Sequence, residues 1–328
     1  MKITFFFRHP DGGFSIAKVS QIFVDAFMRT DDVSKVTMPF HVNGFLAIFR
    51  NMLFAYRHRE REGINHITGG CHYIVLSLLG CKSVLTIHDT VSYDNQHGFF
   101  RRLFFKWFYF KFPLMLADRV VCISDNTRRS VQRFTKRKDL DVIPDAIDDS
   151  IFHPQPKSLP AELPHFLIVG TGWNKNVERE VRALENIPCV IDIVGPVSLS
   201  ISRALEETGA KYRQFKNLSD VEIYNLYVQS DIVLFCSVYE GFGMPVLEAQ
   251  ATGRPVITSR IEPLKGVAGS GACYVDHPES VEEIRKAILK LLSDKDYYGD
   301  LVAKGLKNVT RFMPSVVVSE YARVYKSL

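Results

Sequence analysis

Short apolar runs alternate with amphipathic stretches along the whole chain, and this alternation limits the folds open to it. Apolar runs of this length are typical of buried strands, and the stretches between them carry a helical period. Strands that alternate with helices indicate a parallel sheet covered by helices on both faces. In the first half, strands are expected at residues 2–8, 34–39, 64–68, 83–88 and 119–123.

A proline-rich segment interrupts the alternation near the middle of the chain. Residues 151–164 contain four prolines and little periodicity, which is typical of a linker. Strands are expected again after it, at 165–170, 189–195, 212–215, 231–236, 255–258 and 272–275. The 328 residues suit two α/β domains. We therefore predict two doubly wound domains facing a central cleft, with ligands beyond the carboxyl ends of the strands.

Cysteine usage and hydropathy favour a cytoplasmic protein. None of the six cysteines has a metal-binding spacing, so we interpret them as small buried residues in a reducing compartment. The first apolar run covers only residues 3–7 and is too short for a secretory signal. No uncharged apolar stretch approaches the roughly 18 residues that a membrane span requires.

The segment after the strand at 231–236 carries the strongest functional pattern. Glu240 lies in the loop, where its carboxylate can point into a cleft, and Gly241 and Gly243 permit tight turns close to a ligand. A helix is expected to begin near Met244, with a proline in its first turn. The unpaired N–H groups and the dipole of that helix start favour an anion such as a diphosphate.

A second carboxylate follows on the same helix. Glu248 lies eight positions after Glu240 and can accept hydrogen bonds from ribose hydroxyls, so the two carboxylates can bracket one phosphorylated sugar. A strand, loop and helix with surface glutamates would be the structural alternative, but it does not explain the Gly-Phe-Gly sequence after Glu240.

The run Glu240-Gly-Phe-Gly-Met-Pro-Val-Leu-Glu248 resembles the E-x7-E signature of retaining glycosyltransferases with the GT-B fold, especially glycosyltransferase family 4. Further stretches resemble that family at 85–89, 119–124, 143–152, 169–176, 193–196 and 218–220. The resemblance implies two Rossmann-like domains. Residues 1–155 would bind the acceptor, 156–312 would bind the nucleotide sugar, and a last helix at 313–328 would pack back on the first domain.

The resemblance also implies roles for single residues. Glu240 would contact the donor sugar, Lys175 would neutralise the departing diphosphate, and His88 would lie beside the sugar. These three residues are the predicted catalytic group. The expected donor-binding residues are Glu248, Gly241, Phe242, Gly243, Met244, Gly12, Gly13 and Ser219. The expected acceptor-side residues are His9, Asp89, His72 and Tyr73.

The chain departs from the family pattern in places. Asn174 stands where the family usually has an arginine before the lysine, which removes one phosphate-binding cation. Asp145-Ala146 replaces the usual Asn-Gly, and we expect this change to affect only the turn. Asp294-Lys-Asp296 is formally a D-x-D pair, but it lies between two expected helices, so a helix cap is predicted. No metal and no cofactor are expected.

An aromatic and basic segment leaves two interpretations open. Residues 99–112 contain nine aromatic and four basic residues. The segment can be a core helix with basic residues on its wet side, although an ordinary helix buries only one stripe. It can also be an interfacial helix that dips into anionic lipid headgroups, which would fit a lipid-linked acceptor.

We therefore predict a retaining glycosyltransferase in polysaccharide or glycan assembly, located in the cytoplasm or peripherally on the cytoplasmic face of the membrane. Its donor would be a UDP- or GDP-sugar, and its acceptor a hydroxyl of a saccharide or lipid-linked saccharide. No nucleic-acid partner is expected. Two alternatives remain: a non-catalytic module that binds membranes or polyanions and has a vestigial donor site, and a sugar-nucleotide epimerase of the same fold.

Overall fold

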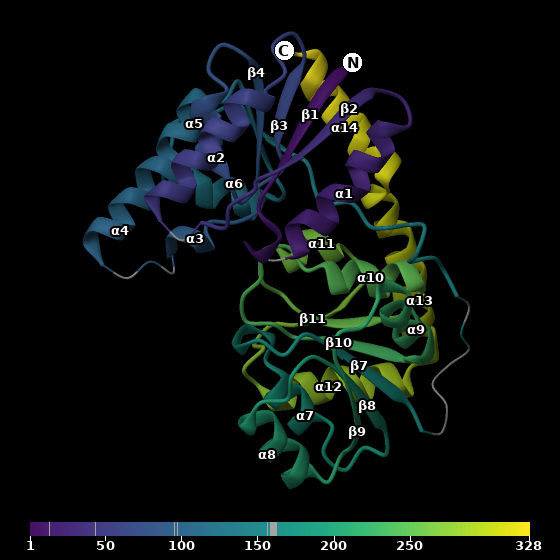
Figure 1. Ribbon diagram of the computed structural model, residues 1–328. Helices are drawn as coiled ribbons and strands as arrows, with labels where there is room; N and C mark the ends of the chain where they lie inside the picture. Colours follow the sequence, from purple (N-terminus) through teal and green to yellow (C-terminus); the bar gives the residue numbers. More distant parts are fainter. Residues whose placement is uncertain (13, 43, 95, 97, 156, 158–162) are drawn as a thin grey trace. The chain divides into compact units, whose positions relative to one another are not determined.

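The computed structural model describes residues 1–12, 14–42, 44–94, 96, 98–155, 157 and 163–328. The chain forms two compact units (Figure 1). The first contains Met1–Ala146 and Phe312–Leu328, and the second contains Ile147–Arg311. The change from one unit to the other therefore lies after Ala146, whereas the sequence placed it after residue 155.

The first unit is built on a six-stranded parallel sheet with the strand order β2-β1-β3-β4-β5-β6. The direction of winding changes between the neighbouring strands β1 and β3, which makes their carboxyl ends the usual place for a ligand. The strands are β1 (Lys2–Phe7), β2 (Asp32–Thr37), β3 (Ile64–Ile67), β4 (Lys82–Ile87), β5 (Arg119–Cys122) and β6 (Leu140–Val142).

Successive residues of these strands enter two separate cores. Phe6 and Leu85 belong to the cluster on one face, and their chain neighbours Phe5 and Val84 belong to the cluster on the other face. Side chains alternate between the faces of a strand, so a strand that is buried on both faces reads as a continuous apolar run. This is why the central strands β1, β3 and β4 were visible in the sequence.

The helices of the first unit flank this sheet. They are α1 (Phe14–Met28), α2 (Phe45–His58), α3 (Val91–Asp94), α4 (Phe99–Phe104), α5 (Phe112–Leu116), α6 (Asp125–Val131) and α14 (Pro314–Lys326). The aromatic and basic segment at 99–112 does not form one regular helix, because a π-helical segment, η3 (Phe105–Lys111), joins α4 to α5. A π-helical insertion turns successive side chains differently from a regular helix, so apolar periodicity does not reveal it.

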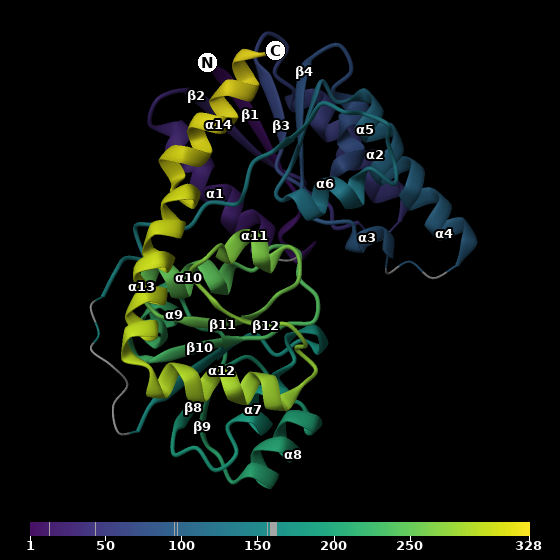
Figure 2. The same cartoon turned by 180° about the vertical axis from the view of Figure 1, so that it is seen from behind.

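The C-terminal helix α14 completes the core of the first unit (Figures 1 and 2). The ring of Tyr321 stacks on that of Phe23 of α1, with 4.7 Å between the centroids. The hydroxyl of Tyr325 lies 2.6 Å from Nδ1 of His66 in β3. Both tyrosines are buried, so α14 covers apolar side chains of α1 and the sheet.

The second unit contains another six-stranded parallel sheet, with the order β12-β11-β10-β7-β8-β9. The winding reverses between β7 and β10, which pair in the register Ile232 with Phe166. The strands are β7 (His165–Val169), β8 (Val190–Val194), β9 (Lys211–Phe215), β10 (Ile232–Phe235), β11 (Val256–Ser259) and β12 (Cys273–Val275).

Seven α-helices are described in the second unit. They are α7 (Val177–Ala183), α8 (Leu199–Thr208), α9 (Asp220–Gln229), α10 (Met244–Thr252), α11 (Leu264–Ala268), α12 (Val281–Ser293) and α13 (Lys295–Val309). Phe152 belongs to this unit because its buried ring packs edge-on against Tyr224 and Tyr227 of α9. In the parts of the chain that the structure describes, no helix is both long and apolar enough to span a bilayer.

Candidate active site

A partly buried ion pair lies at the strand ends where the winding of the second sheet reverses. Lys175 follows β7 and Glu240 follows β10, and Lys175 Nζ lies 2.6 Å from Glu240 Oε1. Their side chains are only 20% and 10% exposed. Nζ also lies 4.4 Å from the centroid of the Phe235 ring. Because water is partly excluded, charges at this position interact more strongly than they would on an open surface.

The backbone around Lys175 is shaped for this contact. Gly170 has a φ of +87°, and a Cβ there would lie 3.1 Å from Cε of Lys175. Asn176 takes the left-handed backbone conformation, and its side-chain amide donates a hydrogen bond to the carbonyl of Cys236 at 3.0 Å. The loop after β7 is thus tied to the end of β10, which brings the lysine to Glu240.

Asn174, the replacement for the family's arginine, supports the same loop. Its Nδ2 donates to the carbonyl of Tyr239 at 2.8 Å, and its own carbonyl accepts from the N–H of Val238 at 2.9 Å. Nδ2 also lies 3.4 Å from Glu240 Oε1. Asn174 therefore holds the segment that carries Glu240. The family pattern showed only that a cation is lost at this position. It gave no sign of the contact with Glu240.

The helix α10 begins directly after this loop. Gly243 is its N-cap with a φ of +109°, and a Cβ there would clash with Leu264 Cδ2. The first turn has no acidic residue and no side-chain cap. Phe242 is buried, whereas Gly241 and Met244 are half-buried. The start of α10 therefore offers backbone N–H groups and a positive dipole end next to Glu240.

Glu248 and Ser219 lie on the two neighbouring helices. Glu248, on α10, is half-buried and accepts a hydrogen bond of 2.7 Å from the hydroxyl of Tyr227 in α9. Ser219 is the N-cap of α9 and forms a reciprocal capping box with Glu222. The structure thus gives Ser219 a local role in starting α9.

A buried carboxyl group beneath this site was missed by sequence reasoning. Glu180 of α7 is fully buried, and its Oε1 accepts from the N–H of Cys236 at 2.6 Å. Burial raises the pKa of Glu180 to about 7, although the Cys236 hydrogen bond and Lys175 act in the opposite direction. The available signal was an acidic residue on the same helix face as the apolar Val177 and Val181.

In the first unit, polar residues gather at the ends of β1, β3 and β4. Two glycines after β3 permit this packing. A Cβ on Gly69 would lie 2.7 Å from Cδ2 of His88, and a Cβ on Gly70 would lie 2.6 Å from Cδ of Arg8. A cavity of about 100 Å³ lies here, and its lining includes Arg8, His9 and Gly70.

Each ring nitrogen of His88 faces a hydrogen-bond acceptor. Its Nε2 lies 2.9 Å from the carbonyl of Thr68, and its Nδ1 lies 3.4 Å from Asp145 Oδ2. Burial by itself lowers the pKa of His88, but Asp145, Thr68 and Asp89 together outweigh burial and raise it. Since neither partner can donate a proton, the geometry fits an imidazolium. Asp145 therefore does more than shape a turn, which corrects the sequence-based expectation.

The four expected acceptor-side residues differ in their surroundings. His9 is half-buried, with Nδ1 3.6 Å from Asp11 Oδ2, and Asp89 accepts from the N–H of Val91 at 2.9 Å. His72 and Tyr73 are buried. His72 Nδ1 bonds to the carbonyl of Tyr109, and the Tyr73 hydroxyl accepts from Asn51 at 2.9 Å. His72 and Tyr73 are thus engaged inside the core, although the Tyr73 ring lines the small cavity.

The glycine pair after the first strand and the D-x-D pair were also predicted to have particular roles. Gly12 lies in a 3-10 turn (Pro10–Gly12) after β1, and Gly13 lies outside the described residues. Asp294 is the N-cap of α13 and accepts from the N–H of Tyr297 at 2.9 Å. Across the described ranges, no group of three or more His, Cys, Asp or Glu residues is placed to hold a metal ion.

Several solved structures share this architecture over their whole length. Sucrose-phosphate synthase from Thermosynechococcus elongatus superposes with a TM-score of 0.81 at 17% identity, over 100% of this chain and 98% of that one. Anabaena HepE in complex with UDP superposes with a TM-score of 0.79 at 14% identity, over the whole of both chains. The protein thus has the two-unit α/β fold of the GT-B glycosyltransferases, as the sequence predicted.

Matches to protein-family models identify the family to which the chain belongs. The model of the glycosyl transferases group 1 matches residues 125–308, and the model of glycosyltransferase family 4 matches residues 8–151. The first match alone covers more than half of the chain, so the protein belongs to the glycosyl transferases group 1. The prediction of a family 4 type glycosyltransferase is confirmed.

Two mannosyltransferases of Escherichia coli are similar to this chain. O-antigen chain mannosyltransferase B of Escherichia coli is 28% identical over 165 residues, which are 47% of this chain and 43% of that protein. The serotype-specific mannosyltransferase WbdA of Escherichia coli is 26% identical over 259 residues, which are 70% of this chain and 32% of WbdA. The chain therefore spans less than half the length of either relative.

Proposed function

We propose that the protein transfers a sugar from a nucleoside diphosphate to a hydroxyl group of a saccharide or lipid-linked saccharide, with retention of anomeric configuration. The observation that carries the proposal is the Lys175–Glu240 ion pair of 2.6 Å at the winding reversal of the second sheet. The start of α10 lies directly after Glu240 and adds a positive dipole end.

Each of these groups has its own role in the proposed reaction. The bond between the anomeric carbon and the diphosphate breaks, and the acceptor oxygen forms the new bond on the same face of the sugar. Lys175 and the start of α10 stabilise the charge that develops on the departing diphosphate. Glu240 orients the sugar, Glu248 accepts hydrogen bonds from the ribose, and the leaving phosphate takes the acceptor proton. No metal takes part in this scheme.

Similar proteins support the choice of donor and acceptor classes. HepE of Anabaena was solved with UDP and with UDP-glucose. Two relatives are named O-antigen chain mannosyltransferases. We therefore propose a UDP- or GDP-hexose as donor and a growing glycan of the cell envelope as acceptor, which places the protein in polysaccharide synthesis in the cytoplasm.

Nucleotide binding is the first test of the proposal. Thermal unfolding is measured with UDP, GDP, ADP and CMP, each with magnesium and with EDTA. A ligand at about a hundred times its dissociation constant stabilises a protein by roughly 2.7 kcal/mol, which gives a clear rise in Tm. We expect one nucleoside diphosphate to stabilise the protein equally with and without metal. Absence of stabilisation by all four contradicts the proposed donor site.

The variant Glu240→Gln separates an enzyme from a binding module with a vestigial site. The variant keeps the size of the side chain but loses the charge that Lys175 pairs with. We expect sugar transfer to fall by at least about a hundredfold while the fold is retained. The control is Glu178→Gln, which changes an exposed carboxylate on α7. Transfer at the parental rate by Glu240→Gln would show that the site is assigned wrongly.

We also propose that the first unit contacts an anionic membrane surface. Exposed aromatic residues of α2 and α4 form what we call the aromatic surface: Phe45, Phe49, Phe99 and Phe100, each more than 60% exposed. The two helices meet where the rings of Phe45 and Phe104 lie 4.8 Å apart. An open apolar pocket of about 590 Å³ adjoins this contact and includes Arg101 in its lining.

The chemistry of the aromatic surface fits a lipid headgroup layer. Arg101, Arg102 and Lys106 are exposed beside its rings. Exposed aromatic side chains next to basic residues are typical of segments that lie in the interface of an anionic bilayer. A glycan carried on a lipid would be presented at such a surface.

Vesicle binding tests the membrane proposal. We expect the parent protein to sediment with phosphatidylcholine vesicles that contain phosphatidylglycerol, and to be released by salt because the attraction is partly electrostatic. The double variant Phe99→Ser and Phe100→Ser should stay in the supernatant. Leu199→Ser is the control, since Leu199 is 90% exposed on α8 of the second unit. Equal sedimentation of the double variant and the parent contradicts the proposal.

A further inference from the structure

A buried tyrosine hydroxyl contacts the second carboxylate of the signature. The Tyr227 hydroxyl lies 2.7 Å from Glu248 Oε2. The carboxylate can only accept, so the phenol donates this hydrogen bond. Burial first, and then the nearby Glu248, hold the pKa of Tyr227 well above its usual value. The hydroxyl therefore remains a proton donor throughout the physiological pH range.

The tyrosine side chain is tightly enclosed. Tyr227 has no exposed surface, and the Phe152 ring packs against it at 80° with 5.8 Å between the centroids. Its hydroxyl also lies 3.4 Å from the carbonyl of Pro245, in the first turn of α10. Because the ring is enclosed, the packing determines the position of its hydroxyl relative to α10.

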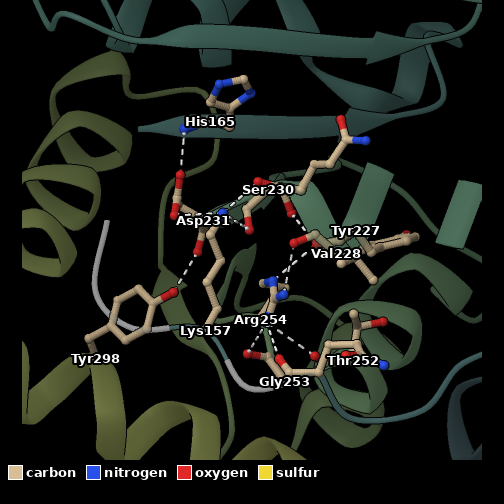
Figure 3. Close-up of polar contacts among 12 residues, drawn as sticks. Lys157, His165, Tyr227, Val228, Ser230, Asp231, Thr252, Gly253, Arg254 and Tyr298 are labelled. Atoms are coloured by element: carbon tan, nitrogen blue, oxygen red, sulfur yellow. Dashed lines mark hydrogen bonds and ion pairs between the residues drawn. The ribbon is translucent and has the colours of Figure 1, made fainter. Parts of the chain in front are cut away.

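A single buried guanidinium fixes the backbone that carries this tyrosine (Figure 3). Arg254 Nε donates to the carbonyl of Tyr227 at 3.0 Å, and its Nη2 donates to that of Val228 at 2.9 Å. Its Nη1 donates to the carbonyls of Thr252 and Gly253 at 3.2 and 3.1 Å. Arg254 thus joins the C-terminal ends of α9 and α10, where carbonyl groups lack helical partners.

A neighbouring ion pair supports the same region (Figure 3). Lys157 Nζ lies 2.9 Å from Asp231 Oδ1, and the N–H of His165 donates to Asp231 Oδ2 at 2.8 Å. The carbonyl of Asp231 accepts from the hydroxyl of Tyr298. Lys157 Nζ also donates to the carbonyls of Gln229 and Ser230 at the end of α9. The same lysine therefore links the end of α9 to the residue that precedes β10.

We propose that Tyr227 is a positioning residue of the donor site, whose hydroxyl holds the Glu248 carboxylate in the orientation that accepts the ribose hydroxyls. This inference rests on the proposed function, in which Glu248 binds the ribose. Tyr227 is fully buried and acts through Glu248. A glutamate side chain on a helix has several rotamers, and a hydrogen bond from a fixed donor selects one of them before the ligand arrives.

The test compares a nucleoside diphosphate with its analogue that lacks the ribose hydroxyls. The probe is whichever of UDP, GDP and ADP binds the parent most tightly, together with its 2′,3′-dideoxy form. We expect Tyr227→Phe to weaken binding of the ordinary nucleotide about tenfold, the effect of one lost hydrogen bond to a charged group. Binding of the dideoxy form should stay unchanged. Loss of packing alone would weaken both nucleotides equally.

A neighbouring tyrosine offers a matched control. Tyr224 lies on the same helix, and its hydroxyl bonds to His153 instead of Glu248. Tyr224→Phe should leave the preference for the ribose hydroxyls at the parental value, and Glu248→Gln should reduce it. If the parent binds none of the three nucleotides, the proposed function fails. If the parent prefers the ordinary nucleotide and Tyr227→Phe keeps that preference, only the role of Tyr227 is refuted.

Discussion

At the scale of single residues, hydrogen-bond partners distinguish groups of the same chemical type. His72 and His88 are both buried histidines. Burial lowers the pKa of His72 to about 4, whereas the carboxylate of Asp145 keeps that of His88 above its usual value. Glu180 and Glu240 also have different partners, since only Glu240 has a lysine at hydrogen-bond distance. Burial and the partners of each ring together set the direction in which the pKa of each histidine moves.

Glu180 gives a prediction of pH-dependent stability. Its folded-state pKa of about 7 lies above the ordinary 4.5, so folding favours the protonated form. The contribution of this carboxyl group to the free energy of unfolding is therefore fully present below the unfolded-state pKa of 4.5. It is lost as the pH rises through about 7. The loss is about 3 kcal/mol for this shift. In Glu180→Gln, which is never charged, this part of the pH dependence should vanish.

Urea unfolding between about pH 5 and about pH 8 measures the effect of Glu180. The matched control is Glu178→Gln on the same helix, where the carboxylate is 44% exposed and contacts Arg182. That variant should follow the parental pH profile. A Glu180→Gln profile as steep as that of the parent contradicts the assignment.

At the scale of elements, the start of each helix depends on the residue that precedes it. Ser124, Ser219 and Ser280 cap their helices with side-chain oxygens. Gly243 caps α10 through its backbone conformation alone and leaves no side chain over the helix start. A helix start without a side-chain cap has N–H groups available for a ligand, and α10 is the helix that follows Glu240.

Gly243→Ala tests the start of α10. A φ of +109° strains an alanine, and its Cβ would meet Leu264. We expect a loss of about 1–3 kcal/mol in the free energy of unfolding and weaker nucleotide binding. Gly299→Ala on α13 is the control, because a Cβ there meets nothing within 4 Å and alanine favours a helix. Unchanged stability and binding in Gly243→Ala would contradict this account.

At the scale of the whole molecule, the last helix joins a unit that the chain left after Ala146. α14 begins after the second unit is complete, yet its buried tyrosines pack on α1 and on the first sheet. The first unit therefore forms its full core only after the entire chain is available. Such a non-local contact contributes to the stability of the first unit. The family resemblance implied it, whereas the local sequence pattern of the helix does not.

Tyr321→Ala measures this contribution. The variant removes a buried ring that stacks on Phe23 and a hydroxyl 3.1 Å from Thr86 Oγ1. We expect about 3–5 kcal/mol of destabilisation of the first unit in urea unfolding. Nucleotide binding by the second unit should persist. Val316→Ala, at a 42% exposed position of α14, should change little. Equal effects of the two substitutions would contradict a buried role for Tyr321.

The sequence by itself determined the two parallel sheets and the candidate donor segment. Strands buried on both faces must be apolar throughout, and a turn such as that at Gly243 requires glycine, so both leave local patterns. Only the tertiary structure decided that Asn174 supports Glu240, that Asp145 pairs with His88 and that Tyr227 holds Glu248. These partners come from different elements, and a contact between elements depends on packing in three dimensions, which residue type and spacing do not encode.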